Sequence, residues 1–159
     1  MPTLKKTTPP TAYYDLVRAA REKDETKDCA VKAIALATGA EYATVLEMLA
    51  AEGRKKKGGT HDRQTREVLR KLGYGMKKMP FIEMRKIIKG YPKPHCNAIK
   101  NITTYHPRRF PESFTERFTG KVILFFTKSH VACYRDSEMH DWSTNNRLHV
   151  TEIYEVKKI

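Results

Sequence analysis

The chain has only three cysteines among its 159 residues, and they lie far apart in the sequence. So few and scattered cysteines exclude the disulfide framework that stabilises many small secreted domains. The longest apolar run, residues 122–126, is far too short to cross a bilayer. The opening segment lacks the basic flank, apolar stretch and cleavage site of a secretory signal. We therefore expect a cytoplasmic protein with no membrane partner, long enough to bury a core without covalent cross-links.

Acidic residues are scarce in the middle of the chain. The protein has 31 Lys and Arg against 18 Asp and Glu, a formal net charge of +13. Residues 54–121 contain 19 of the basic residues but only 5 acidic ones, so this segment carries the whole excess. Such an asymmetry favours contact with a polyanion, either nucleic acid or an acidic partner protein. The residues assigned to this surface belong to a basic loop and to the helix expected after it. They are Arg54, Lys55, Lys56, Lys57, Arg63, Arg66 and Arg70.

Helical patterns fill the first part of the chain and strand patterns the last. We predict a flexible arm at residues 1–10 and a single domain at 11–159. Within this domain, residues 11–120 are mainly helical and residues 121–159 form an antiparallel sheet. The apolar run 122–126 is expected to be a central strand covered on both faces. Helices first and an antiparallel sheet second predict an α+β fold.

Apolar residues at helical spacing predict four helices at the start of the domain. The first lies within residues 11–27 and ends in the charged run 21–25; the others cover residues 29–38, 41–51 and 60–72. We expect Asp28 to cap the second helix and Thr60 the fourth, because both side chains accept hydrogen bonds from the first helical turn. Gly39 follows the second helix and suits the left-handed conformation found there. A short strand is expected at residues 74–79.

The helix after Asp28 begins on a cysteine. Unpaired N–H groups and the helix dipole favour an anion at this position, so the Cys29 thiol should ionise more readily than a free one. Cysteine is also a small hydrophobic residue that usually serves packing. A nucleophilic Cys29 therefore requires a base, and the base requires an orienting partner.

The base and its partner are expected on one hairpin near the end of the chain. His130 begins the first strand, and Asp141 lies on the second. If a two-residue turn joins the strands, Asp141 falls on the same face as His130, one diagonal step away. A three-residue turn would put His140 or Trp142 on that face instead. Asn145, in the polar turn that follows, is the alternative orienter.

Cys29, His130 and Asp141 together supply a nucleophile, a general base and an orienting carboxylate. The imidazole draws the thiol proton, and the thiolate attacks a carbonyl carbon. The same imidazole later protonates the leaving amine. The backbone N–H of Cys29, at the start of its helix, would face the developing oxyanion.

Three motifs follow one another along the chain. They are Asp28-Cys29-Ala30-Val31-Lys32-Ala33, Gly53-Arg54-Lys55…Gly59-Thr60, and His130-Val131-Ala132-Cys133 followed by Asp141-Trp142. In this order they resemble papain-like cysteine peptidases, and most closely the small papain-like proteins encoded by bacteriophages. The resemblance spans residues 28–147 and implies a helical half packed on a C-terminal sheet. It also implies a thiol hydrolase, acting as peptidase, isopeptidase or amidase on a protein or peptide substrate without a cofactor.

One departure from that family concerns the second oxyanion donor. Papain-like enzymes usually carry a glutamine shortly before the nucleophile, whereas this chain has Lys27 and Thr26 there, which we expect to substitute for it. The alternative is a catalytically inactive papain-like scaffold that binds nucleic acid or an acidic host protein through its basic segment. Either protein would act in the cytoplasm of the infected host cell or travel with the virion.

Histidines and cysteines elsewhere offer an alternative zinc interpretation. The candidates are His95 and Cys96 with His106, or Cys133 with His140. No Cys-x-x-Cys or His-x-x-x-His spacing accompanies them, which argues against a closed metal site. We predict that the protein binds no metal.

Overall fold

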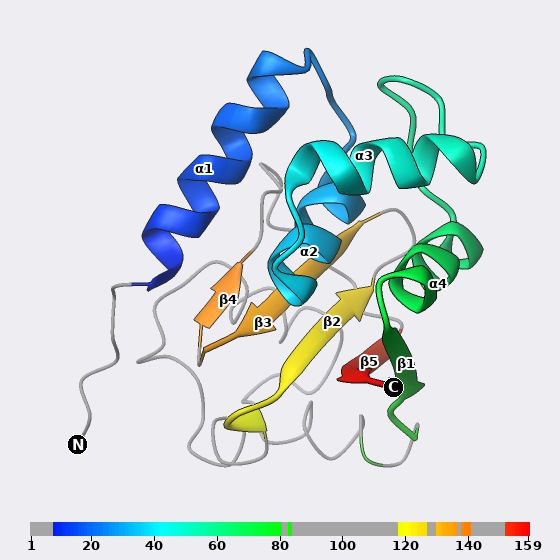
Figure 1. Ribbon diagram of the computed structural model, residues 1–159. Helices are drawn as coiled ribbons and strands as arrows, with labels where there is room; N and C mark the ends of the chain where they lie inside the picture. Colours follow the sequence, from blue (N-terminus) through cyan, green and yellow to red (C-terminus); the bar gives the residue numbers. More distant parts are fainter. Residues whose placement is uncertain (1–7, 81–82, 84–117, 127–129, 137, 141–151) are drawn as a thin grey trace.

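The computed structural model describes residues 8–80, 83, 118–126, 130–136, 138–140 and 152–159. In this part of the chain four helices come first: α1 (Thr8–Glu22), α2 (Cys29–Thr38), α3 (Tyr42–Ala51) and α4 (Asp62–Lys71). The strands are β1 (Tyr74–Lys78), β2 (Val122–Phe126), β3 (Val131–Arg135), β4 (Glu138–His140) and β5 (Glu152–Lys158). The helices lie on one face of the sheet (Figure 1). The predicted α+β class is confirmed.

The strands form one sheet in the order β1-β5-β2-β3-β4, and every neighbouring pair is antiparallel. β2 lies in the middle, where Phe126 pairs with Val131 of β3 and Val122 pairs with Val156 of β5. Residues 123–126 are all buried. The prediction of a central strand covered on both faces is therefore confirmed.

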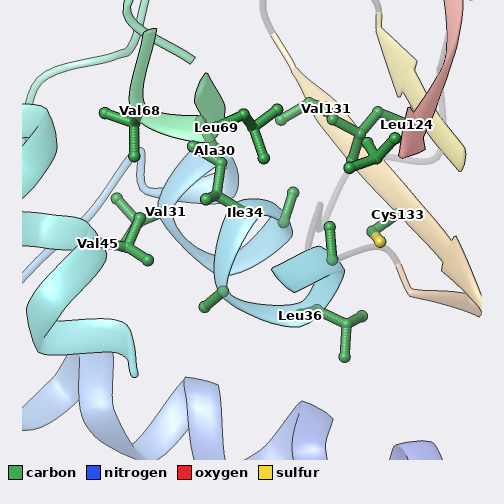
Figure 2. Packing of buried hydrophobic residues seen from close by; sticks show 14 of the residues in the cluster. Ala30, Val31, Ile34, Leu36, Val45, Val68, Leu69, Leu124, Val131 and Cys133 are labelled. Atoms are coloured by element: carbon green, nitrogen blue, oxygen red, sulfur yellow. The ribbon is translucent and has the colours of Figure 1, made fainter. Parts of the chain in front are cut away.

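Alternating side chains give this sheet two apolar faces. Leu124, Val131 and Cys133 pack against α2 (Figure 2). Phe125 points to the opposite face, where its ring meets that of Phe118 edge-on at 6.1 Å between centroids. The helix-covered face holds the larger cluster, which orders α2 against β3 and so fixes where the first residue of α2 lies.

α2 is almost entirely buried because its residues are small or aliphatic. Val31 and Ile34 have no exposed surface, and the buried alanines of the helix let it approach the sheet closely. Gly39 ends the helix with φ of 81°, and its N–H donates to the Ala35 carbonyl at 2.8 Å. The predicted glycine stop is confirmed. None of the described helices is long and apolar enough to span a membrane.

α1 begins earlier than predicted and ends where it was predicted to end. It begins at Thr8, so residues 8–10 belong to the helix rather than to an arm, while residues 1–7 lie outside the described residues. It ends at Glu22, within the charged run 21–25 where its end was predicted, and the residues that follow do not continue it: Asp24 and Lys27 both have φ of 51°, in the left-handed region.

The N-terminus of α4 also differs from the prediction. Its N-cap residue is His61, one position after Thr60. Gln64 accepts a hydrogen bond from the His61 N–H at 2.7 Å and donates one to the Glu52 carbonyl at 3.1 Å. A buried glutamine that connects two segments therefore sets where this helix begins, in place of the expected threonine cap.

Candidate active site

The packing of α2 on β3 brings a thiol and an imidazole together. Cys29 is the first residue of α2, and His130 directly precedes β3. The His130 side chain is hydrogen-bonded to the Cys29 thiol. The two groups come from opposite halves of the chain, as the sequence analysis predicted. The fold therefore places a potential base in contact with a potential nucleophile.

The surroundings of Cys29 favour its ionised form. Burial, the largest single effect, raises the pKa of the Cys29 thiol, whereas the hydrogen bond and the positive charge of His130 lower it. Hydrogen bonds from the backbone N–H groups of Val131 and Ala30 to the sulfur lower the pKa further. The net result is a pKa below the ordinary value of a cysteine. This thiol therefore carries more negative charge near neutral pH than a free one does.

The first turn of α2 leaves backbone donors at the site. The N–H of Lys32 is the first to find a partner within the helix, at 3.1 Å from the Asp28 carbonyl. The N–H groups of Cys29, Ala30 and Val31 have no acceptor within the helix. Ala30 directs its N–H at the sulfur. The N–H of Cys29 has no acceptor within the helix and belongs to the nucleophile itself, as expected of an oxyanion donor.

Asp28 does not cap α2, contrary to the prediction. Although it occupies the N-cap position, its side chain makes no capping hydrogen bond. The carboxylate instead accepts a hydrogen bond from the Tyr42 hydroxyl at 2.7 Å and pairs with the Lys32 ammonium at 3.2 Å. Burial, followed by the adjacent carboxylate, raises the pKa of Tyr42, which therefore remains a donor. The Lys32 charge offsets the negative charge directly before Cys29.

Asp141 was predicted to lie on the face of His130 only if a two-residue turn joins the two strands of the hairpin. Arg135 of β3 pairs with Glu138 of β4, so two residues join the strands. Asp141, Trp142 and Asn145 lie outside the described residues.

His140 occupies a different part of the hairpin, opposite Cys133. It is buried, and this burial, with smaller effects from neighbouring charges, lowers its pKa to about 4. Its imidazole is therefore neutral at physiological pH. His140 is not brought to the Cys29 thiol in the way that His130 is.

The expected glutamine substitutes are not seen at the thiol. The side chains of Thr26 and Lys27 are exposed, and neither is among the groups that hydrogen-bond Cys29. The Thr26 carbonyl accepts a hydrogen bond from Arg54 at 3.2 Å. These two residues shape the loop before Cys29, and their side chains supply no oxyanion donor in the described site.

Arg54 was expected on a polyanion-binding surface, and this expectation is wrong. Only 6% of the residue is exposed, and its Nη2 lies 3.0 Å from the Glu25 carboxylate. Lys57 pairs with Asp24 at 3.2 Å. An acidic partner distant in sequence explains how the arginine of a basic loop is buried. Lys55 and Lys56 remain exposed.

The three arginines of α4 are exposed, as expected, but acidic neighbours offset part of their charge. Arg70 makes two hydrogen bonds to Glu67, at 2.7 and 3.1 Å. Arg63 lies 3.9 Å from Glu52. The Arg66 guanidinium lies over the tyrosine ring of β5, 5.4 Å from its centroid. This face of α4 is less free to bind a polyanion than its sequence indicates.

The described residues contain no group of three or more His, Cys, Asp or Glu placed to hold a metal ion. Cys133 and His140 face each other across β3 and β4, but they are only two ligands. Burial raises the pKa of Cys133 to about 12, which disfavours the thiolate that a metal requires. The other zinc candidates, His95, Cys96 and His106, lie outside the described residues.

A cavity of about 230 Å³ lies apart from the thiol. It opens near Ile123, at the end of β2 far from the Phe126–Val131 pair that adjoins His130. Its lining consists of Lys77, Lys78, Met79, Pro80, Glu83, Phe118, Lys121, Ile123 and Glu155. It contains neither a cysteine nor a histidine, and we assign it no part in the chemistry of Cys29.

Two features of the site were missed by the sequence analysis. Lys32 lies four residues after Asp28, a spacing at which opposite charges meet on a helix, so this pair was detectable. The contact between Tyr42 and Asp28, and the one between Arg54 and Glu25, join segments that only the fold brings together. No local pattern indicates either of them.

The described site thus combines a thiol, an imidazole and backbone donors at a helix N-terminus. Comparison of the chain with protein-family models, with curated proteins and with solved structures finds no match.

Proposed function

We propose that the protein is a papain-like thiol hydrolase that cleaves a peptide, isopeptide or related amide bond. The hydrogen-bonded pair of Cys29 and His130 at the start of α2 carries this proposal. A thiol in contact with an imidazole is a nucleophile with its base at hand. The arrangement of a thiol-bearing helix on an imidazole-bearing antiparallel sheet supports a papain-like architecture.

The first half of the reaction transfers an acyl group to sulfur. His130 takes the proton of the Cys29 thiol, and the thiolate attacks the carbonyl carbon of the substrate. The Cys29 N–H stabilises the negative charge that develops on the carbonyl oxygen. The carbon–nitrogen bond then breaks, and His130 gives its proton to the leaving amine. A thioester on Cys29 remains.

The second half releases the acyl group to water. Neutral His130 takes a proton from a water molecule, whose oxygen attacks the thioester carbon. The carbon–sulfur bond breaks, a carboxylic acid leaves, and the proton returns to the Cys29–His130 pair. In this mechanism Asp141 accepts a hydrogen bond from the second imidazole nitrogen and keeps the ring oriented, with Asn145 as the alternative partner.

Alkylation of the three cysteines tests the activated thiol. Near pH 7, iodoacetamide should label Cys29 faster than Cys96 and Cys133, because only the thiolate reacts and Cys29 has the lowered pKa. His130→Ala should slow the labelling of Cys29. Cys133→Ser, which removes the buried thiol of β3, is the matched control and should leave the labelling of Cys29 unchanged. Equal labelling of all three cysteines contradicts the proposal.

Turnover is tested with an activated ester. p-Nitrophenyl acetate should acetylate Cys29, as an intact-mass measurement would show, and the acetyl group should then be released by hydrolysis. Cys29→Ser should abolish the adduct. An acetyl adduct that persists, with no further nitrophenol released, contradicts hydrolase activity and favours an inactive scaffold.

Two exposed lysines favour the second candidate function, a binding protein on an inactive papain-like scaffold. Lys55 and Lys56 make no ion pair with the described residues. For nucleic acid, affinity should fall steeply with salt and should weaken in Lys55→Gln/Lys56→Gln. Lys71→Gln is the control, because Lys71 is already paired with Glu52 at 2.6 Å. The absence of binding at low salt excludes nucleic acid as the partner.

A further inference from the structure

A buried ion pair holds the loop that leads into Cys29. This loop connects the end of α1 at Glu22 to the start of α2. The Glu25 carboxylate lies 3.0 Å from Nη2 of Arg54, and the side chains are only 4% and 2% exposed. The same guanidinium nitrogen donates to the Thr26 carbonyl at 3.2 Å. Arg54 therefore binds both a side chain and the backbone, three to four residues before the thiol.

The Glu25 carboxylate is bound from a second direction. The backbone N–H of Lys57 donates to the same oxygen, Glu25 Oε1, at 2.9 Å. Arg54 is itself fixed to the end of α3, because its N–H donates to the Leu49 carbonyl at 2.9 Å. The segment 54–57 thus supports the loop before Cys29 and is itself bound to α3.

The loop needs such a support. Asp24 and Lys27 both adopt φ of 51°, a conformation that non-glycine residues rarely hold unless surrounding contacts impose it. Arg54 contacts both residues that lie between these two positions, Glu25 and Thr26. In addition, Nε of Arg54 is buried with no hydrogen-bond partner among the described residues. The buried position of Arg54 is therefore held through the contacts of its Nη2 rather than through Nε.

We propose that Arg54 is a positioning residue for Cys29: by binding Glu25 and the Thr26 carbonyl, it sets the direction in which the chain enters α2 and so keeps the sulfur against His130. This inference rests on the proposed function. It assigns the first arginine of the basic loop to the reactivity of the thiol rather than to a polyanion. The thiolate depends on contacts with His130, Val131 and Ala30, so a small shift of Cys29 weakens all of them together.

The test measures the rate of Cys29 alkylation by iodoacetamide as a function of pH, with the labelled peptide identified by mass spectrometry. Arg54→Met removes both contacts but keeps an unbranched apolar side chain. We expect it to lower the Cys29 rate at pH 7 about tenfold or more and to shift the profile toward that of an ordinary thiol. Arg54→Lys keeps the charge but lacks the guanidinium fork. Its Cys29 alkylation rate should fall between those of the unmodified protein and Arg54→Met.

Two controls separate positioning from loss of the fold. Arg70→Met breaks an exposed pair on α4 that does not contact the loop, and it should leave the profile unchanged. Labelling of Cys133, which is fully buried, reports opening of the core within the same sample. If Arg54→Met does not fold, Glu25→Gln carries the test, because it removes the charge of the other partner while keeping its shape.

Each result decides a separate point. A low rate at Cys29 with Cys133 still protected supports the positioning role. If Arg54→Met and Glu25→Gln both keep the lowered pKa of Cys29, this inference is overturned and the proposed function stays intact. An ordinary thiol profile in the unmodified protein overturns the proposed function, and this inference with it.

Discussion

At the scale of single residues, Asp28 raises the question of how a carboxylate is tolerated directly before a thiolate. Two negative charges side by side oppose each other, and burial strengthens the effect. Lys32 supplies the opposite charge at 3.2 Å, and Tyr42 supplies a hydrogen bond at 2.7 Å. Both carboxylate oxygens of Asp28 are thereby engaged, one by each partner. Its function in this structure is to link α2 to α3 through Tyr42.

Lys32→Met tests this account. The substitution leaves the Asp28 charge buried without a cation, one residue before Cys29. We expect the pKa of Cys29 to rise and its alkylation at pH 7 to slow several-fold. The free energy of unfolding should fall by about 1 to 3 kcal/mol, because a buried charge has lost its partner. The measurements are the pH profile of iodoacetamide labelling and a urea titration.

Tyr42→Phe is the matched control for Lys32→Met. It removes a hydrogen bond to the same carboxylate without changing any charge. We expect it to lower stability but to move the Cys29 profile less than Lys32→Met does. If the two variants shift the profile equally, the charge of Lys32 is not what protects the thiol.

At the scale of secondary-structure elements, the contact between α2 and β3 is what joins Cys29 to His130. The aliphatic face of α2 supplies most of this contact (Figure 2). One polar contact adds direction: the Arg135 guanidinium, at the far end of β3 from His130, donates to the Leu36 carbonyl near the end of α2. The helix and the strand are therefore connected at both ends, by Arg135 at one and by the thiol at the other.

Arg135→Gln should loosen this pair of elements. Loss of a charge-assisted hydrogen bond to Leu36 is expected to lower the free energy of unfolding by about 1 to 2 kcal/mol. It should also slow Cys29 labelling, because the helix can shift along the strand. Arg135→Lys, which retains a cation, should lose less. A stability loss with no change at Cys29 would show that apolar packing alone aligns α2.

β4 gives the hairpin a dependence on pH through His140. Burial holds the pKa of this imidazole at about 4, below its ordinary value of 6.5. Between these values the unfolded chain binds a proton that the folded chain does not, so stability falls as pH falls from 6.5 toward 4. The loss is at most about 3 kcal/mol. His140→Asn should reduce this loss in urea titrations at pH 7, 5.5 and 4, and an unchanged pH dependence would contradict the assignment.

The elements that could be predicted from the sequence are those whose residues decide their own structure. The apolar run of β2 and the small-residue helix α2 with its glycine stop are of this kind. The errors arose where a distant partner decided. Asp28 was expected to cap α2, yet Tyr42 of α3 binds it; Arg54 was expected on the surface, yet Glu25 makes its burial tolerable.

The same distinction applies to the candidate site. Cys29 and His130 were identifiable because the first begins a helix and the second directly precedes a strand, and the type of both elements is evident from the sequence. Their contact follows from helix-on-sheet packing. The backbone N–H of Val131 at the sulfur could not be predicted, because a backbone donor has no sequence signature.

At the scale of the whole molecule, the net charge is +13. The described basic residues include some that pair with acidic neighbours and some that are exposed without an ion pair. Many basic groups are offset by acidic neighbours, as the pairs of Arg70 with Glu67 and of Lys71 with Glu52 illustrate. Lys27, Lys55 and Lys56 are exposed and make no ion pair with the described residues. They belong to the loop before Cys29 and to the segment that supports it. Part of the uncompensated charge of the described residues therefore lies on the segments on either side of this contact, before the thiol and in the loop after α3.

This distribution predicts that Cys29 favours anionic reactants. Iodoacetate carries a negative charge and iodoacetamide none, so the ratio of their alkylation rates reports the electrostatic potential at the sulfur. At low ionic strength the ratio at Cys29 should exceed that of free cysteine by severalfold, and it should decline as salt approaches about 0.15 M, where screening acts over about 8 Å. Lys27→Gln/Lys55→Gln/Lys56→Gln should reduce the ratio while leaving the iodoacetamide rate nearly unchanged. Lys77→Gln, on β1, is the control for overall charge. A ratio equal to that of free cysteine at every salt concentration would show that the excess charge does not act at the thiol.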